Sequence, residues 1–382
     1  MRVAYKYRLY PTHEQAEFLT EQLREACDLY NCALEERRSA WKYCRISLNY
    51  FDQANQLKAM RAQGLIGLAN YSCCQDVLRR LDKTFRAFYE RSKRGEKAGL
   101  PRFRSLRRYD SITFPSYGDG SKLLENGRLR IQGAGEIKVK LHRPVAGRIK
   151  TVTVKREVEQ WFVCFSVGRE LAEPLPKSDA EIGMDVGLNS FAVLSDGSQV
   201  QNPRPLAQAQ AELRRAQRRV ARRKKGSHRR RRAVILLAKA QRKVRNQRLN
   251  FQHQLSWWLM VSFGFLATED LTIGGMARGR FARSVHDAGW GSFFRMLAYK
   301  AECAGRELVK VDPRGSSQTC SCGASVEKKL KDRWHECLAC GLSAPRDVVS
   351  AQVILQRARI ERSGRNVGVV VPSVLREAVC FS

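Results

Sequence analysis

Apolar and polar positions alternate with different periods along this chain, and each period predicts a type of element. Residues 3–10 alternate basic with apolar or aromatic side chains, which is typical of a half-buried strand. Pro11 ends that strand, and Thr12 with Gln15 predicts a capping box in front of a helix that reaches about Trp41. A second helical pattern covers residues 70–94.

The rest of the chain changes from strand-like to mixed patterns. Short alternating runs separated by Gly and Pro predict β structure between about 104 and 168, and residues 171–176 look like a linker. Two apolar strands joined by a short turn are expected next, at 181–187 and 191–194. The remaining predicted elements are strands at 261–268 and 306–311, helices at 287–304 and 347–362, and a basic, glycine-containing loop at 274–283.

Charge narrows the choice of partner. The 382 residues include 70 Lys and Arg against 37 Asp and Glu, a formal net charge of +33. A charge of this size predicts a polyanionic partner. The longest apolar run, near 257–266, is too short and interrupted to span a bilayer, and the N-terminus has no signal-peptide pattern. We therefore expect a cytoplasmic protein. A basic protein bound to a membrane surface is the alternative, but no clear amphipathic anchor supports it.

The positive charge is concentrated in residues 204–248, which contain eighteen Lys or Arg and one acid, Glu212. Ala and Leu recur at helical spacing, and Gly226-Ser227 divides the run into two helices. Solvated helices usually alternate charge sign, so we favour a nucleic-acid-binding hairpin over an exposed helix pair. The contacts predicted here are Arg218, Arg222, Arg223, Lys224 and Lys225. The aromatic residues Trp257, Trp258, Phe293 and Phe294 are predicted to be core.

Three isolated acids lie at the ends of predicted core elements. Asp185 interrupts an apolar strand, Glu269 ends a later apolar run, and Asp347 opens the last helix. A buried carboxylate is costly unless it is paired, and a metal ion is its usual partner. A strand, a turn and a strand, then a strand ending in Glu and a helix carrying Asp, is the order of an RNase H-like nuclease. The order predicts two Mg²⁺ ions acting on phosphate, with ordinary strand-end acids as the alternative.

Four of the twelve cysteines are clustered as Cys320-x-Cys322 and Cys337-x₂-Cys340. Two such pairs predict a zinc ribbon with one Zn²⁺. The first pair is one residue short, so a metal-free knuckle, or a site in which His335 replaces a cysteine, stays open. The other eight cysteines are predicted to be small core residues: Cys27, Cys32, Cys44, Cys73, Cys74, Cys164, Cys303 and Cys380.

With these residues in hand, the chain resembles the TnpB family of transposon-associated nucleases, which is related to compact type V CRISPR effectors. The resemblance covers about residues 1–357. The matching stretches are 7–11 with Gln15, 30–31 with Leu34, 99–104, 183–187, 268–271, 287–291, 316–321, 337–341 and 346–347. Two departures are the short first cysteine pair and Val349, where the family pattern has Asn.

The resemblance implies an RNA-guided DNA endonuclease that takes a guide RNA from the transposon end and cuts double-stranded target DNA beside a short motif, with one RNA per monomer. It implies catalytic acids at Asp185, Glu269 and Asp347, and zinc ligands at Cys320, Cys322, Cys337 and Cys340. It also places Arg333 near the scissile phosphate and Gln75 at the target-adjacent motif. Arg102 and Arg104, in a matching stretch, are further expected nucleic-acid contacts.

The expected fold is a multidomain α/β chain. The predicted parts are a β-barrel wedge domain (1–11 and 99–177), a helical recognition lobe (12–98), an RNase H-like (RuvC) nuclease (178–315 and 343–362) with a basic hairpin insert (204–255), a zinc ribbon (316–342) and a tail (363–382). A nuclease-weak, RNA-guided repressor is the first alternative, since Val349 departs from the pattern. A DNA transposase is the second, although no dedicated DNA-binding domain is visible.

Overall fold

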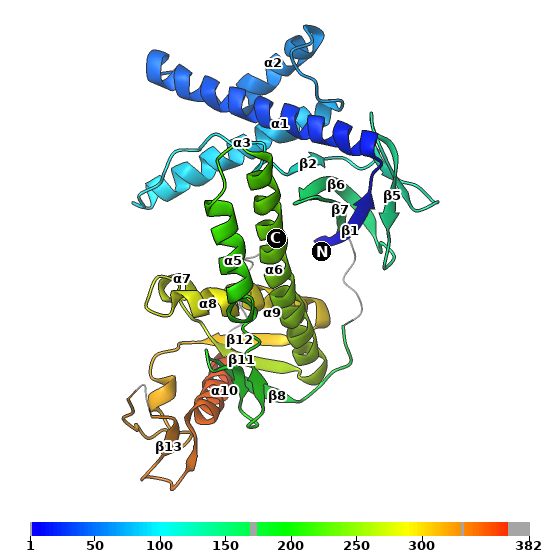
Figure 1. Ribbon diagram of the computed structural model, residues 1–382. Coiled ribbons are helices and arrows are strands. Elements are labelled where there is room, and N and C mark those ends of the chain that lie inside the picture. Colours follow the sequence, from blue (N-terminus) through cyan, green and yellow to red (C-terminus); the bar gives the residue numbers. More distant parts are fainter. Residues whose placement is uncertain (1, 169–173, 330–331, 366–382) are drawn as a thin grey trace. The chain divides into compact units, whose positions relative to one another are not determined.

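The computed structural model describes residues 2–168, 174–329 and 332–365, which form two compact units divided near residue 170 (Figure 1). The predicted linker at 171–176 and the predicted tail at 363–382 lie largely outside the described residues. No helix among those described combines the length and apolar character needed to cross a membrane.

The first unit is built on a seven-stranded antiparallel sheet. Its strands are β1 (Arg2–Tyr10), β2 (Ser111–Phe114), β3 (Ser121–Leu123), β4 (Arg128–Ile131), β5 (Gly135–Lys140), β6 (Arg148–Glu157) and β7 (Gln160–Gly168), in the order β2-β6-β7-β1-β5-β4-β3. The N-terminal strand thus lies in the middle of a sheet whose other strands come after residue 110, and the helices between them are an insertion. The end strands β2 and β3 are not paired with each other, so closure into a barrel stays a prediction.

Three helices form the insertion: α1 (His13–Ser39), which continues as a short π-helix (Ala40–Cys44), α2 (Tyr50–Ala62) and α3 (Tyr71–Lys93). The predicted capping box is confirmed, because the Gln15 N–H donates to Thr12 Oγ1 over 3.3 Å and the Thr12 N–H to Gln15 Oε1 over 3.1 Å. Arg37 joins all three helices: its Nε donates to Gln53 of α2 over 2.8 Å, and a terminal nitrogen reaches Asp82 of α3 at 3.3 Å.

The second unit contains a five-stranded mixed sheet. Its strands are β8 (Glu181–Val186), β9 (Ser190–Leu194), β10 (Gln199–Gln201), β11 (Phe265–Glu269) and β12 (Glu307–Val311), in the order β10-β9-β8-β11-β12. Its helices are α4 (Pro205–Gln208), α5 (Gln210–Ala221), α6 (His228–Ser262), α7 (Ile273–Met276), α8 (Ala282–Ala288), α9 (Trp290–Ala304) and α10 (Arg346–Arg365). A short 3₁₀ turn, η2 (Ser316–Gln318), and a two-stranded ribbon, β13 (Trp334–Glu336) with β14 (Ser343–Pro345), complete it. The strands β8, β11 and β12 are mutually parallel.

Helices cover both faces of this sheet. Side chains of α6 and α9 pack on one face against Ile182, Met184 and Leu266. On the other face Ile354 and Ala358 of α10 pack against strands β11 and β12. The sheet core is therefore closed on two sides, as parallel strands require.

Several predicted boundaries are wrong. Helix α6 continues to Ser262, so the strand predicted at 261–268 begins at Phe265. The predicted loop at 274–283 contains most of α7 and the start of α8. The helix predicted at 287–304 is interrupted at Gly289, whose φ of +67° lies in the left-handed region that ends a helix.

Some of the predicted core residues are exposed. Phe293 and Phe294 are buried as predicted, but Trp257 and Trp258 are 53% and 44% exposed on α6. The eight scattered cysteines also differ in burial. Three are buried (Cys27, Cys73, Cys74), two are partly buried (Cys164, Cys303), two are exposed (Cys32, Cys44), and Cys380 lies outside the described residues.

The closest approach between α10 and the sheet occurs at Gly183 of β8. A Cβ atom at this position would overlap the backbone oxygen of Ala351 and would lie 2.9 Å from Leu355 Cβ. Because backbone cannot rotate away as a side chain can, any larger residue must push the helix off the strand. Glycine is therefore required here by packing.

We predict that Gly183→Ala lowers the free energy of unfolding by about 1–3 kcal/mol through this overlap, measured by urea denaturation. Gly99→Ala is the control, because a Cβ there meets no atom within 4 Å. Equal stability of the two variants would contradict the packing argument.

Candidate active site and metal centre

The sheet brings two of the predicted acids side by side. Met184 of β8 pairs with Thr268 of β11, so the next residues, Asp185 and Glu269, lie at the same level on neighbouring parallel strands. Side chains alternate between faces along a strand. Since Ile182, Met184 and Leu266 face α6 and α9, Asp185 and Glu269 face α10. The second residue of α10 is Asp347, which brings the third acid to this end of the sheet.

The three carboxylates share one electrostatic field. Burial raises the pKa of Asp185 well above its usual range, Glu269 and Asp347 raise it further, and Arg346 opposes them. Burial also raises the pKa of Glu269, while a hydrogen bond from the Ser316 hydroxyl and the charge of Arg357 lower it. Ionising this group without a cation is therefore unfavourable, which is the environment expected of a divalent-metal site.

Oxygen donors of this kind fit Mg²⁺, which prefers carboxylates and water as ligands. The acids are not gathered as tightly as ligands of one ion: within the part of the chain that the structure describes, the four cysteines alone form a group of three or more potential ligands close enough to hold a single metal. The acids thus fit cations that are shared between carboxylates better than one ion bound by all three.

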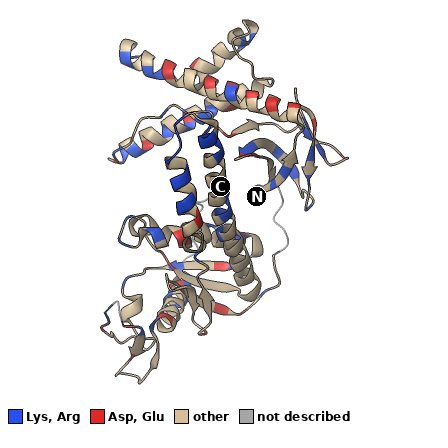
Figure 2. Ribbon diagram, viewed as in Figure 1, with Lys and Arg blue, Asp and Glu red and all other residues tan. Residues whose placement is uncertain are grey.

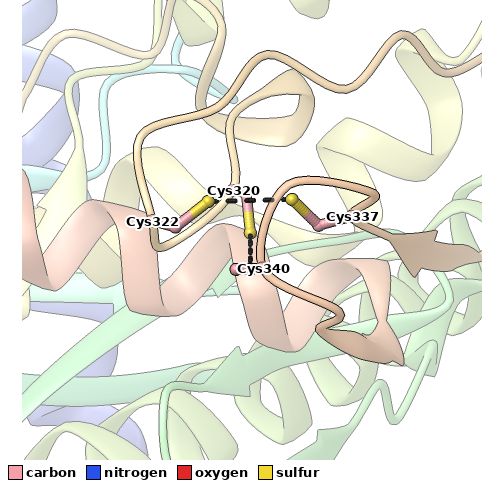
Figure 3. A group of neighbouring side chains, drawn as sticks. All are labelled: Cys320, Cys322, Cys337 and Cys340. Atoms are coloured by element: carbon pink, nitrogen blue, oxygen red, sulfur yellow. Dashed lines mark hydrogen bonds between the residues drawn. The ribbon is translucent and has the colours of Figure 1, made fainter.

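The four predicted zinc ligands converge (Figure 3). The sulfur of Cys320 lies 3.6 Å from that of Cys340, the sulfur of Cys322 lies 3.7 Å from that of Cys337, and all four lie within 4.8 Å of one another. A tetrahedral site with Zn–S bonds of about 2.3 Å separates sulfur atoms by about 3.8 Å. The arrangement therefore fits Zn²⁺.

The short first cysteine pair still forms a turn. The Cys320 N–H donates to Ala324 O over 2.8 Å, and the Gly323 N–H to Cys320 O over 2.9 Å, with Gly323 at a φ of +91°. His335 is fully buried, and its Nδ1 contacts the Lys328 ammonium, so it does not join the sulfur cluster. The structure thus favours four cysteines over the alternative in which His335 replaces one of them.

Two of the four thiols have pKa values that are shifted in opposite directions. Backbone N–H groups of Cys340 and Ala339 lower the pKa of Cys337 to about 7. For Cys340 the Leu342 N–H also lowers the pKa, but hydrogen bonds shared with the Cys322 and Cys337 thiols outweigh it and raise the pKa to about 12. A bound dication would reverse that balance and favour four thiolates.

Arg346 fastens the cysteine module to the acids, and sequence reasoning gave it no role. Its guanidinium donates to the carbonyl oxygens of Lys329 and Asp332, each over 3.3 Å, and its backbone N–H donates to Arg333 O over 2.9 Å. The exposed Arg333, predicted to lie near the scissile phosphate, is thereby placed beside the start of α10. The position of Arg346 directly before Asp347 was the available signal.

The predicted basic hairpin is present (Figure 2). Leu213 of α5 and Ala233 and Val244 of α6 form its buried seam. The predicted contacts Arg218, Arg222, Arg223, Lys224 and Lys225 are exposed, and no acid within the described ranges pairs with them. The hairpin therefore presents unneutralised positive charge to solvent.

The other predicted nucleic-acid contacts lie in the first unit. Gln75 is half-buried near the start of α3, and Arg102 is exposed. Arg104 lies 5.0 Å from the centre of the Tyr30 ring, and its backbone exchanges hydrogen bonds of 2.8 and 2.9 Å with the Asn31 side chain. Asn31 thus holds the segment that carries both arginines.

Comparison with known proteins identifies the family. Residues 152–280 match an IS605 OrfB family described as "Probable transposase", and residues 290–354 match one described as "Cas12f1-like, TNB domain". A protein of Streptomyces pristinaespiralis, provisionally named an RNA-guided DNA endonuclease, is 32% identical over 362 residues, which cover 92% of this chain and 88% of that protein. The chain belongs to the OrfB (TnpB) family.

Further relatives agree with this TnpB assignment. The Escherichia coli K12 protein InsQ, with the same provisional name, is 27% identical over 300 residues, which are 74% of this chain and 73% of InsQ. A solved structure named a mini-RNA-guided endonuclease, CRISPR-Cas phi3, covers 94% of this chain and 92% of its own at 9% identity and a TM-score of 0.51, which shows a shared mixed α/β fold. Residues 1–45 match a family described as "Helix-turn-helix domain", but here residues 2–44 form one strand, one long helix and a π-helix turn.

We predict one Zn²⁺ per chain, bound by the four cysteines. Cys337→Ser should abolish stoichiometric zinc, measured by elemental analysis, and should unfold the module, since structural zinc contributes folding free energy. The control is Cys303→Ser, which lies outside the cluster. If Cys337→Ser keeps its zinc, the assignment of the ligands is wrong.

Proposed function

We propose that this chain is an RNA-guided DNA endonuclease of a transposable element, which cuts target DNA at an RNase H-like (RuvC) site formed by Asp185, Glu269 and Asp347. The main support is the convergence of these three acids at one end of the sheet, within a shared field, in a member of the TnpB family. The provisional names of the relatives support the same substrate and guide.

The residues of the proposed site have different roles in phosphodiester hydrolysis. Divalent cations held by the carboxylates would neutralise charge on the scissile phosphate and lower the pKa of the attacking water. Asp185 is central, since its field includes both other acids. The Ser316 hydroxyl orients Glu269, and Arg346 holds the loop at Arg333 beside Asp347. The exposed Arg333 would contact the scissile phosphate. This contact needs a cation whose side chain can move with the DNA strand.

Binding of the guide is proposed for the basic surfaces. The α5–α6 hairpin carries cations that no acid of the described chain neutralises, as binding of a structured polyanion requires. Sequence readout would come from base pairing between guide and target, so the protein needs contacts to phosphates and sugars more than to base edges.

A nuclease-weak repressor remains the second candidate because of Val349. This side chain is fully buried on α10, two residues after Asp347, and offers no hydrogen bond to the acids. The repressor and the nuclease differ in one measurable property: both bind guide and target, but only the nuclease cuts.

We predict that Asp185→Asn and Glu269→Gln each abolish cleavage of target plasmid in Mg²⁺, while guide and target binding stay within about twofold. Both variants keep side-chain shape and remove the charge that holds the cations, which should reduce the rate by several orders of magnitude. The assay measures plasmid cleavage and DNA affinity on the same preparation. Binding without cleavage by the wild-type protein would establish the repressor.

The same variants test the metal site without relying on activity. Because burial, and after it the charges of Glu269 and Asp347, raise the pKa of Asp185, the ionised wild type should be less stable than Asp185→Asn at neutral pH in EDTA. Mg²⁺ should raise the melting temperature of the wild type and leave that of Asp185→Asn nearly unchanged. Equal responses to Mg²⁺ would remove the acids from the metal site.

We predict that guide RNA binding weakens steeply with salt. Replacing Arg222, Arg223, Lys224 and Lys225 together by Ala should reduce the slope of log affinity against log salt by about 3, because about 0.7–0.9 counterions are released per phosphate contact. The control is Arg86→Ala with Arg94→Ala, since both arginines pair with acids. An unchanged slope in the quadruple variant would remove the hairpin from the RNA interface.

A further inference from the structure

A short basic arm, residues 276–283, follows the strand that ends in Glu269 and has no role in the proposals above. Glu269 is the last residue of β11, and the chain continues from it through α7 into the arm. Ile273 and Ala277 pack against the core of the second unit, and Val285 beyond the arm is buried. The arm is thus anchored at both ends on the unit that carries the acids.

The arm presents positive charge that nothing neutralises. Arg278, Arg280 and Arg283 are all exposed, and no acid in the described part of the chain forms an ion pair with them. The two nearest acids in the sequence are already engaged. Asp270 pairs with Lys310 at 3.3 Å, and Asp287 accepts from the Leu206 and Ala207 N–H groups. Three unpaired cations in the unit that carries the acids favour a phosphate partner.

The arm also exposes an aromatic ring. Phe281 is 59% exposed, although its neighbours Ala277 and Val285 are covered. The Arg280 guanidinium lies 5.9 Å from the centre of the Phe281 ring. An exposed ring flanked by cations is the arrangement with which proteins stack an unpaired base while holding its backbone. Inside a duplex both faces of a base are covered by the neighbouring base pairs, so the partner is single-stranded.

We propose that the basic arm binds the single strand of target DNA next to the scissile phosphate, with a base stacked on Phe281 and phosphates on Arg280 and Arg283. The inference rests on the proposed function, because the strand is the substrate of the three acids. DNA is favoured over the guide RNA because the arm belongs to the unit that carries the acids and follows the strand ending in Glu269 by way of α7.

The test uses the full chain with its guide RNA. In Asp185→Ala, which leaves target DNA uncut, 2-aminopurine is placed at successive positions of the target strands. At one or more positions its fluorescence should be quenched, the quenching should be lost with Phe281→Ala, and it should be retained with Phe281→Trp. With Asp185 intact, Phe281→Ala should cut about tenfold more slowly, as expected for loss of one stacked base, while target affinity stays within twofold. Phe281→Trp should restore the rate.

Charge is tested separately. Arg280→Ala with Arg283→Ala should reduce the salt slope for binding of a single-stranded oligonucleotide by about 1.4, from two phosphates at about 0.7 each. Phe51→Ala, at a ring on α2 that is 70% exposed, and the paired-arginine variant Arg86→Ala with Arg94→Ala should behave like wild type.

Three results would overturn the proposal: unchanged cleavage by Phe281→Ala, failure of Phe281→Trp to restore quenching, or loss of guide RNA binding in Phe281→Ala, which would assign the arm to RNA. These results differ from failure of the proposed function itself, in which the wild-type protein neither binds guided DNA nor cuts it.

Discussion

The contact between α10 and β8 at Gly183 fixes the geometry on which the rest of the second unit depends. Asp185 comes two residues after this contact on the strand, and Asp347 comes four residues before Ala351 on the helix. The close approach of the two backbones therefore sets how the two acids face each other. The parallel pairing of β8 with β11 then adds Glu269 at the same level. Three acids distant in sequence are thus placed by one helix-strand contact and one strand register.

This placement is electrostatically unfavourable by itself. Burial raises the pKa of Asp185, and Glu269 and Asp347 raise it further, so in the folded chain ionisation of Asp185 is unfavourable without cations. The cysteine module shows a related effect, since hydrogen bonds shared with the Cys322 and Cys337 thiols raise the pKa of Cys340. Arg346 connects the acids with the cysteine module through its hydrogen bonds to Lys329, Asp332 and Arg333. A metal ion bound at the cysteines would therefore stabilise a module that Arg346 joins directly to the helix that carries Asp347.

Sequence alone predicted the parts of this architecture that local patterns encode. The strands around Asp185 and Glu269, the capping box at Thr12 and the cysteine pairs depend on residues close in sequence. The helix α2 was missed because few of its side chains are buried, although Asn49 and Asp52 form a capping box that could have indicated it. The exposed tryptophans and the contacts of Arg346 depend on which surfaces meet in space, and one sequence pattern does not contain that information.

The structure also changes the meaning of the departure at residue 349. Compared with the Asn of the family pattern, Val349 lacks a side chain that could form hydrogen bonds. In the folded chain it is fully buried on α10, between Val348 and Ser350, and the Ser350 hydroxyl bonds back to Arg346 O over 3.0 Å. An Asn amide here would be buried and would cost about 1–3 kcal/mol unless partners were available. The start of α10 is instead held by the Arg346 N–H on Arg333 O and by the tight packing at Gly183. Backbone contacts thus supply the positioning of Asp347 that Val349 cannot.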